Sequence, residues 1–439
     1  MPNLEGAEDS VHATDEVIRL LAHGDPKAAL AWAAPLVKLA PASPVHWFLL
    51  GVALHELGHE GPATTALGLA VDRGIATSNL PVALAACLRI GALGASNEAS
   101  LERLARTFSK DSKLLQAQTD VPPSLPGQRI KLSALAPTVS EEEVLKLVNG
   151  AMEAASELPD ATGVSFQPLF SSLGAAGLGR LLQAFRVIFA PQKMMVVEEG
   201  TPGQEAFVLA RGELEVVKSN ATEGMVLARL GNGALFGEMA LLSRAPRAAS
   251  VVAARPCIVL VAERSRLDKL AEEDPEVGHA LAQFCRQRMI DNLLRTSRLL
   301  RAVSPKERPL LIPQFETQTH EAGTRLIAQG QQSDGMYLIA SGEVQVVHQA
   351  DDGDTLIATL GPGEVVGEVA LVLRRPATAD VIAVHPSVVL HLPRERFLNV
   401  VKNHPQLLAE LYELAVRRDE ETSSIVAEEA TNVDDCILL

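Results

Sequence analysis

The chain of 439 residues is long enough for about three domains of ~100–200 residues each, and 47% of its residues are hydrophobic, so each domain can bury a core. A net charge of −15 disfavours direct binding of the whole chain to a nucleic-acid backbone. No apolar run approaches the ~20 residues of a membrane span, which disfavours a membrane protein, and the four cysteines form no CxxC pair, which favours a reducing cytoplasm over structural zinc or disulfides.

A weak helical repeat with a period of 34 residues occupies the N-terminal part of the chain. Small residues at regular positions let two antiparallel helices approach closely, while Trp47 and Leu54 fill the space between them. The pattern resembles tetratricopeptide repeats, and a degraded third unit is predicted over residues 78–110. The residues that carry the resemblance are Trp47, Leu50, Gly51, Leu54, Gly58, Ala63, Leu67 and Ala70, with Leu20, Gly24, Ala29 and Pro41 one period earlier.

Within this region His55-Glu-Leu-Gly-His59 matches HExxH, the zinc-protease motif. That chemistry needs both histidines on one helix face and the glutamate as base. Gly58 stands where the turn between two helices is expected, and Gly61-Pro62 breaks the helix further. We therefore favour a solvated turn without a metal, with Asp72 or Glu98 as the third ligand if the motif did bind zinc.

Residues 119–140 contain four prolines and are predicted to form a linker. Beyond the linker the sequence repeats itself without a gap at a spacing of 130 residues. Phe207-Val-Leu-Ala-Arg-Gly-Glu-Leu-Glu-Val-Val217 corresponds to Tyr337-Leu-Ile-Ala-Ser-Gly-Glu-Val-Gln-Val-Val347, and Gly237-Glu-Met-Ala-Leu241 corresponds to Gly367-Glu-Val-Ala-Leu371. The repeat predicts two copies of one domain.

Each copy has the pattern of a small antiparallel β-roll, or jelly roll, with helices after it. Short β-branched or alternating stretches are separated by glycine pairs and polar turns, and Pro275 and Pro405 stand where a helix tolerates proline. The predicted strands of the first copy are 207–209, 214–217, 225–230 and 258–261. The predicted helices are 264–272 and 274–300 in the first copy and 394–402 and 404–418 in the second.

The most informative run is Phe236-Gly-Glu-Met-Ala-Leu-Leu-Ser-Arg-Ala-Pro-Arg-Ala-Ala-Ser-Val251. It closely resembles the phosphate-binding cassette of cyclic-nucleotide-binding domains, as in regulatory subunits of protein kinase A and in the catabolite activator protein. The resemblance extends over both copies, at about 166–298 and 297–418. It implies that a residue on the following helix caps the base, and Phe284 and Arg288 are both candidates.

The cassette also suits a cyclic phosphate on chemical grounds. A phosphodiester carries a charge that is not titrated away, so burying it requires a permanent cation and N–H donors. Arg247 supplies a planar charged fork, Gly237 lets the backbone come close, and Glu238 can accept a hydrogen bond from the ribose 2′-hydroxyl. The turn that starts at Glu238 can aim the N–H groups of Ala240 and Leu241 at the same anion.

The predicted ligand is cyclic AMP, with no cofactor and no metal. Ala248 follows the phosphate arginine, where members of the family selective for cyclic GMP often carry threonine or serine, so the resemblance favours cyclic AMP and leaves cyclic GMP as the alternative. The predicted ligand-binding residues are Phe236, Gly237, Glu238, Met239, Ala240, Leu241, Arg247, Ala248, Ala249 and Ser250.

The second copy departs from this pattern. Its arginine position is Ala377, and the loss of one partner of a buried charge pair costs ~2–5 kcal/mol. Asp380 stands where Ser250 stands and is expected to repel a phosphate. We predict that this pocket binds cyclic nucleotides weakly or not at all. The degenerate second pocket comprises Gly367, Glu368, Ala370, Leu371 and Ala377.

The last four residues, Cys436-Ile-Leu-Leu439, match a prenylation box with the terminal leucine of a geranylgeranyl signal. From Asp419 to the end there are seven acidic residues and no basic residue, so a polybasic second membrane signal is missing. We favour an unmodified, disordered acidic tail.

The sequence thus predicts a multidomain α+β protein, with all-α tetratricopeptide-like hairpins followed by two β-roll domains that have flanking helices. The expected function is a cytoplasmic, non-enzymatic adaptor or regulator in signal transduction that responds to a cyclic nucleotide and meets a protein partner through its helical repeats. A constitutive scaffold whose β-rolls bind no ligand is the alternative, and an HExxH metalloenzyme is less favoured. The predicted domains are 1–118 helical repeats, 119–140 linker, 141–298 first β-roll domain, 299–418 second β-roll domain and 419–439 acidic tail.

Overall fold

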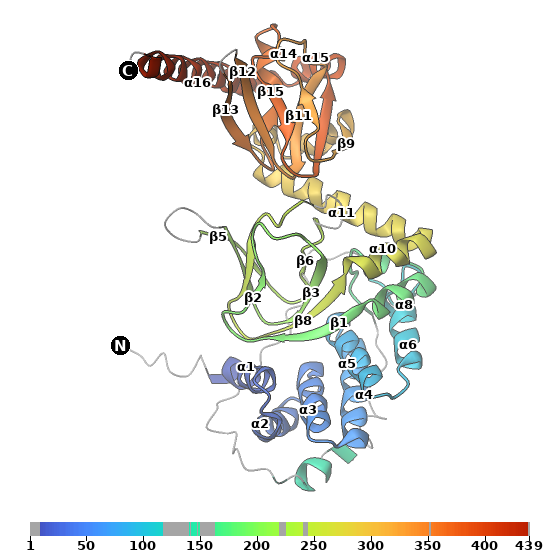
Figure 1. The fold of residues 1–439 in the computed structure, drawn as a ribbon. Helices are drawn as coiled ribbons and strands as arrows, with labels where there is room; N and C mark the ends of the chain where they lie inside the picture. The colour runs from blue at the N-terminus through green and yellow to red at the C-terminus, as the bar shows by residue number, and fades with distance from the viewer. Residues whose placement is uncertain are drawn as a thin grey trace, which may run out of the picture. The chain divides into compact units, whose positions relative to one another are not determined.

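A computed structural model describes residues 9–116, 140, 142–146, 148–149, 163–218, 225–239, 245–350 and 353–437 (Figure 1). The predicted linker lies outside the described residues apart from Ser140. The chain divides into two compact units. The first contains the N-terminal helices and the first β-roll as far as Phe284, and the second continues from Cys285. The short segments 201–203 and 239–248 group with the second unit.

Antiparallel helical hairpins form the N-terminal region, which confirms the predicted helical region, while its tetratricopeptide character stays a prediction. Gly51 and Gly74 are needed for close packing, because a Cβ atom there would lie 2.7 Å from Leu67 Cγ and 2.6 Å from Ala83 Cβ respectively. Trp47 is buried and its indole N–H donates to Pro41 O at 2.8 Å. The helices are α1 (Asp9–Ala22), α2 (Pro26–Leu39), α3 (Pro44–Glu56), α4 (Glu60–Ala76), α5 (Leu80–Ala92) and α6 (Glu98–Phe108).

The first β-roll follows a short lead-in of η2 (Phe170–Ser172) and α8 (Ala175–Gln183). Its two antiparallel sheets have the strand orders β1-β8-β3-β6 and β2-β7-β4-β5. Phe207, Val251 and Val259 are among the apolar side chains buried between the sheets. The strands are β1 (Phe185–Ala190), β2 (Met195–Val197), β3 (Glu205–Arg211), β4 (Leu214–Lys218), β5 (Met225–Leu230), β6 (Leu235–Phe236), β7 (Ser250–Ala253) and β8 (Cys257–Glu263).

The N-terminal helices pack against the outer face of the first of these sheets. Helices α1 and α5 contact β1, α1 also contacts β8, and α5 contacts β3 (Figure 1). The rings of Phe48 and Phe189 stack with centroids 6.1 Å apart. Asp15 of α1 forms ion pairs with Arg211, at 2.9 Å, and with Arg255, at 2.6 Å. The helical region and the first β-roll therefore share one packed interface within the first unit.

The second β-roll has the same design, with strand orders β14-β11-β16-β9 and β10-β15-β12-β13. The outer face of β11 and β16 packs against the flanking helices, with Leu338 and Leu390 meeting Leu300, Phe397 and Leu411 in one apolar core. The strands are β9 (Glu316–His320), β10 (Arg325–Ile327), β11 (Gly335–Ser341), β12 (Val344–Ala350), β13 (Gly353–Leu360), β14 (Val365–Val366), β15 (Asp380–Ala383) and β16 (Ser387–Pro393). The helices are α12 (Arg298–Arg301), α13 (Arg308–Leu311), η3 (Ile312–Gln314), α14 (Glu368–Val372), α15 (Arg394–Asn403) and α16 (Pro405–Ile437).

The internal repeat predicts the correspondence of elements well. Strands β7 and β15, which open at Ser250 and Asp380, start 130 residues apart, as do β6 and β14. The predicted helix over 264–272 corresponds to α10 (Arg264–Glu273), and both the second helix of the first roll, α11 (Pro275–Thr296), and α16 begin at a proline as expected.

Two predicted helix ends need correction. The helix predicted over 274–300 stops at Thr296, because Ser297 starts a new helix whose Leu300 N–H its hydroxyl caps at 3.4 Å. The helix predicted to end at 418 instead continues as α16 to Ile437, through the segment expected to be a disordered tail. Ion pairs of Asp419 with Arg375 and of Glu421 with Arg417 help to hold the acidic residues in helical form.

Candidate functional site

The cassette of the first β-roll begins at the end of β6. Phe236 closes that strand with its ring stacked on Phe207 at a centroid distance of 5.0 Å. The chain then turns through Gly237, whose φ of 75° lies in the left-handed region that glycine adopts without strain. Glu238 follows and is buried, with 6% of its surface exposed. A buried carboxylate at the end of a pleated strand is expensive unless it is hydrogen-bonded, which marks this position as a constructed polar site.

Arg247 lies at the other end of the cassette and is likewise buried, with 9% of its surface exposed. Its backbone N–H donates to Thr201 O at 2.9 Å, and the adjacent Pro246 pairs with Pro202 in an isolated bridge. These backbone contacts fix the residue that carries the guanidinium. Met239 and Ala249 are half-buried, and Ala248 is exposed. Ala240 and Leu241, the predicted N–H donors, lie outside the described residues.

Ser250 organises a turn of the protein. Its hydroxyl accepts a hydrogen bond from Glu199 N–H at 3.0 Å. In the second roll a carboxylate oxygen of Asp380 accepts from Gln329 N–H at 2.7 Å in the same way. The other carboxylate oxygen of Asp380 pairs with Arg325 Nε at 3.2 Å, and Asp380 does not line the second pocket. The expected repulsion of a phosphate by Asp380 is therefore replaced by a structural role that it shares with Ser250.

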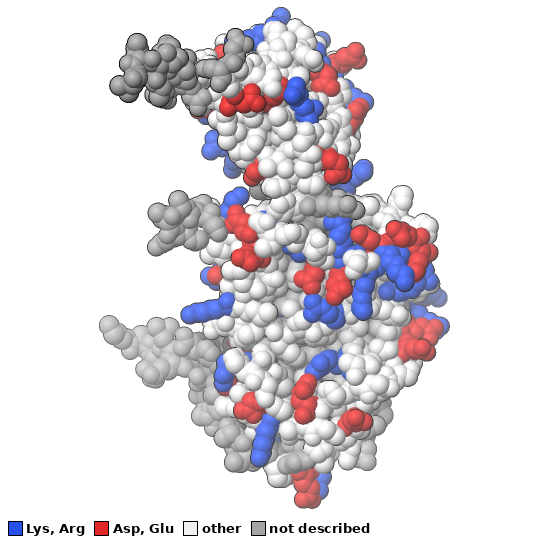
Figure 2. Space-filling model, in the orientation of Figure 1, with Lys and Arg blue, Asp and Glu red and all other residues white. Residues whose placement is uncertain are grey.

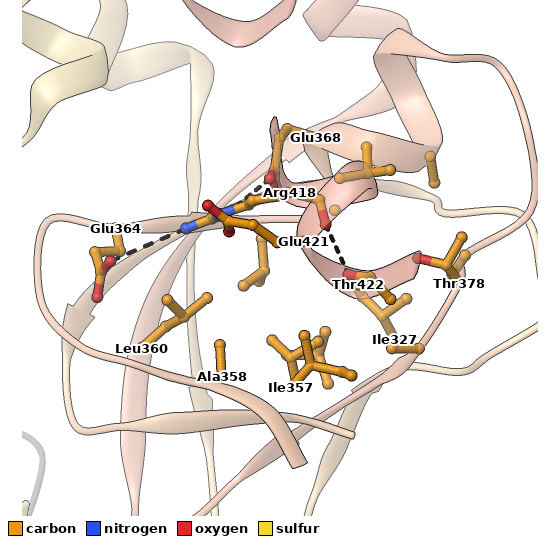
Figure 3. A pocket seen from close by; sticks show the side chains of 18 of the residues that line it. Ile327, Ile357, Ala358, Leu360, Glu364, Glu368, Thr378, Arg418, Glu421 and Thr422 are labelled. Carbon is orange, nitrogen blue, oxygen red and sulfur yellow. Dashed lines mark hydrogen bonds and ion pairs between the residues drawn. The ribbon is translucent and has the colours of Figure 1, made fainter. Parts of the chain in front are cut away.

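The corresponding site of the second roll is a cavity of about 360 Å³ beneath helix α16 (Figure 3). Gly367, Glu368, Ala370 and Ala377 line it, as predicted. Gly367 has a φ of 86°, and a Cβ atom there would lie 2.8 Å from Gly335 O, so the turn requires glycine. Leu371 does not line the cavity. Its side chain packs in the apolar core and its N–H donates to Gly367 O at 3.3 Å.

The sequence did not single out Arg418 of α16, which fills a central place in this second pocket. Its Nη1 donates to Glu368 Oε1 at 2.7 Å and to Val365 O at 2.5 Å, and its Nη2 lies 4.0 Å from Glu364 Oε1 (Figure 3). Glu368 is only 1% exposed, so this guanidinium compensates a fully buried carboxylate. The 130-residue spacing was the available signal, since it places Arg288 opposite Arg418 just as it places Glu238 opposite Glu368.

Ala377 takes the backbone place of Arg247 without its charge. Its N–H donates to Gln331 O at 2.8 Å, as the N–H of Arg247 donates to Thr201 O. Gly330 N–H returns a bond to Ala377 O at 2.8 Å. The second roll thus keeps the frame of the cassette and lacks the cation at this position.

Comparison with known protein families matches this chain to the cyclic nucleotide-binding domain twice, at residues 188–274 and 317–404. The chain carries two cyclic nucleotide-binding domains in tandem. Each matched segment covers one β-roll and the helix after it. Glu238 and Arg247 lie in the first domain, and Glu368 and Ala377 lie in the second.

Similar proteins match over both domains. A cAMP-dependent protein kinase regulatory subunit of Yarrowia lipolytica is 30% identical over 220 residues, which are 50% of this chain and 55% of that protein. The type II regulatory subunit of Drosophila melanogaster is 29% identical over 49% of this chain and 54% of its own length. The regulatory domain of Toxoplasma gondii PKA, solved with cAMP, is 25% identical, with 57% of this chain and 92% of that chain covered at a TM-score of 0.28. The chain spans about half the length of the curated relatives it matches.

The HExxH motif does not have the geometry of a zinc site. Helix α3 ends at Glu56, Gly58 has a φ of 86°, and His59 lies at the start of α4, so the two histidines are not one turn apart on one helix. Glu56 pairs with Arg89 at 2.9 Å. Asp72, a candidate third ligand, pairs with Arg103. Within the described part of the chain, no group of three or more acidic, histidine or cysteine side chains is placed to hold a metal.

The surface adds no contrary signal in the described regions. Basic and acidic side chains are interspersed on the face drawn in Figure 2. Among the helices that the structure describes, none is long and apolar enough to cross a membrane. The prenylation box lies beyond the residues whose side chains are described.

Proposed function

We propose that this protein is a regulator that binds a cyclic nucleotide in its first domain, with cyclic AMP as the favoured ligand. The observation that carries the proposal is the cassette itself, in which Arg247 is buried beside a backbone turn and Glu238 is buried after a left-handed glycine. A permanent cation and a carboxylate acceptor at these positions suit a cyclic phosphate and a ribose hydroxyl respectively. The printed names of the relatives, as regulatory subunits of cAMP-dependent kinases, support the same ligand class.

The test is a titration with fluorescent cyclic AMP on the full chain. Truncating one partner of a buried charge contact costs ~2–5 kcal/mol, so Arg247→Ala should weaken binding about 30-fold or more. Arg186→Ala is the matched control, because Arg186 lies on the same roll in an exposed pair with Glu205 and should leave affinity unchanged. Competition with cyclic GMP ranks the two bases. Equal affinity in wild type and Arg247→Ala would contradict the proposed anion site, and no binding at all would favour the constitutive scaffold.

The N-terminal helices are the proposed output of the first domain. Strand β6 leads directly into Gly237 and pairs with β3, and β3 in turn contacts α5. A change in the cassette turn can therefore reach the helical region through two packed elements. A ligand shifts such an equilibrium only by its differential affinity for the two states. We propose that the helical region presents a surface for a protein partner whose affinity depends on bound nucleotide.

A further inference from the structure

The second pocket retains part of the cassette design and lacks another part. The glycine turn and the buried glutamate are present, and the apolar strands around them form one side of the cavity. The position that should neutralise a phosphate carries the methyl group of Ala377. Under the roles proposed for the first domain, on which this inference rests, the retained residues face sugar and base and the missing one faces the phosphate.

The buried charges of this pocket are already balanced inside the protein. Glu368 is 1% exposed and its carboxylate is compensated by Arg418. A buried anion would have to compete with Glu368 for that guanidinium, and a buried cation would have no second carboxylate of comparable depth among the described lining residues. The other charged lining residues, Glu364, Arg417 and Glu421, are exposed at the rim. The electrostatics therefore favour an uncharged ligand.

The walls suit a flat apolar group. Across the cavity from the Arg418–Glu368 pair lie Ile327, Ile357, Ala358 and Leu360 (Figure 3). Thr422 and Ile425 of α16 complete the lining. The volume of about 360 Å³ lies within the ~300–1,000 Å³ of small-molecule sites. The bond from Arg418 uses Oε1 of Glu368, and a carboxylate has a second oxygen that can accept from a hydroxyl.

We propose that the second domain binds an uncharged ribonucleoside, with its base against the apolar strands and its sugar at the Glu368–Arg418 pair. The same site would reject the cyclic phosphate of that nucleoside, because no cation remains to neutralise it. The two domains then read two different ligands from one family of compounds.

The experiment uses the full chain carrying Arg247→Ala, so that binding reports on the second domain. Calorimetric titrations with adenosine and with guanosine should show one site per chain for at least one of them, and cyclic AMP should show none. Ala358→Phe, added to this background, fills the cavity and should weaken nucleoside binding about tenfold or more. Leu356→Phe is the matched control, because Leu356 lies on the same strand with its side chain exposed.

The outcomes separate this inference from the proposed function. Wild type that binds cyclic AMP while the Arg247→Ala chain binds neither nucleoside would overturn the inference and leave the first site intact. Tighter binding of cyclic AMP than of nucleosides in the Arg247→Ala chain would overturn it as well. Nucleoside binding that Ala358→Phe does not weaken, in a variant whose far-UV circular dichroism matches the parent, would place the ligand elsewhere and refute the assignment.

Discussion

At the scale of single residues, Asp15 has the largest structural burden in the first unit. It lies between Arg211 and Arg255, joins α1 to the β-roll and is almost fully buried. Removing the shared carboxylate leaves two guanidinium groups facing each other in a poorly solvated place. Such a loss is far more costly than the loss of an exposed ion pair.

We expect Asp15→Asn to lower the free energy of unfolding by about 3–5 kcal/mol. Urea unfolding followed by tryptophan fluorescence measures this directly, because both tryptophans, Trp32 and Trp47, lie in the N-terminal helices. Glu16→Gln is the control: the pair of Glu16 with Arg19 is exposed and should contribute less than about 1 kcal/mol. Similar losses in the two variants would refute the special role of Asp15.

His46 gives the same interface a dependence on pH. Burial, reinforced by the nearby charge of Arg211, lowers the pKa of His46 to about 4. An unfolded histidine titrates near ~6.5, so the unfolded chain takes up a proton first and stability falls as pH drops from 6.5 toward 4. Between pH 7 and pH 5 the loss should be about 2 kcal/mol in the tryptophan-detected transition, and His46→Gln should remove that part of the slope. An unchanged slope in the variant would show that other groups carry the effect.

At the scale of elements, α16 has two functions in the second domain. Its first half packs Leu407 and Leu411 into the apolar core, and its second half places Arg418, Thr422 and Ile425 over the pocket. The helix is therefore held both by burial and by one buried ion pair. The acidic residues beyond Arg418 were expected to form a tail because their composition alone gives no reason for order, and the reason lies in contacts with other elements.

Arg418→Ala should cost about 3–5 kcal/mol in the stability of the second domain, since Glu368 is left buried without its cation. The adjacent Arg417→Ala is the matched control, because Arg417 is 57% exposed and makes only a helical pair with Glu421. Hydrogen exchange of β11 and β16 amides reports the stability of this domain. Equal exchange rates in the two variants would argue against the Arg418–Glu368 bond.

The path from β6 through β3 to α5 makes a second prediction at this scale. Cyclic AMP should slow amide exchange in α5, because a ligand at the cassette stabilises the strand against which α5 packs. The protection should be absent in Arg247→Ala. Protection confined to the cassette, with none in α5, would sever the proposed link to the helical region.

At the scale of the whole molecule, the sequence predicted the two β-rolls and their correspondence because the repeat has no gaps and its glycines mark the turns. It also predicted Gly367, Glu368 and Ala377 in one cavity, because a cassette keeps its residues within a short segment. Long-range partners escaped it. The pairing of Arg418 with Glu368 and of Asp15 with two arginines depends on how distant elements pack, which no local pattern encodes.

The role of Ser250 shows the reverse limit. Its place inside the cassette suggested a ligand contact, yet its hydroxyl accepts from Glu199 N–H, and Asp380 does the same in the second domain. A serine and an aspartate are interchangeable as acceptors for a backbone N–H, although they differ in charge. The aligned sequences gave their identities, and only the structure gave the hydrogen bond that both share.

The most direct measurement is the number of cyclic AMP molecules bound per chain, obtained by calorimetry on the full-length protein at several micromolar. The account predicts one tight site, lost in Arg247→Ala and kept in Ala377→Gly. Two equal sites would show that a cassette without arginine still binds the phosphate. A single site that survives Arg247→Ala would contradict the central assignment.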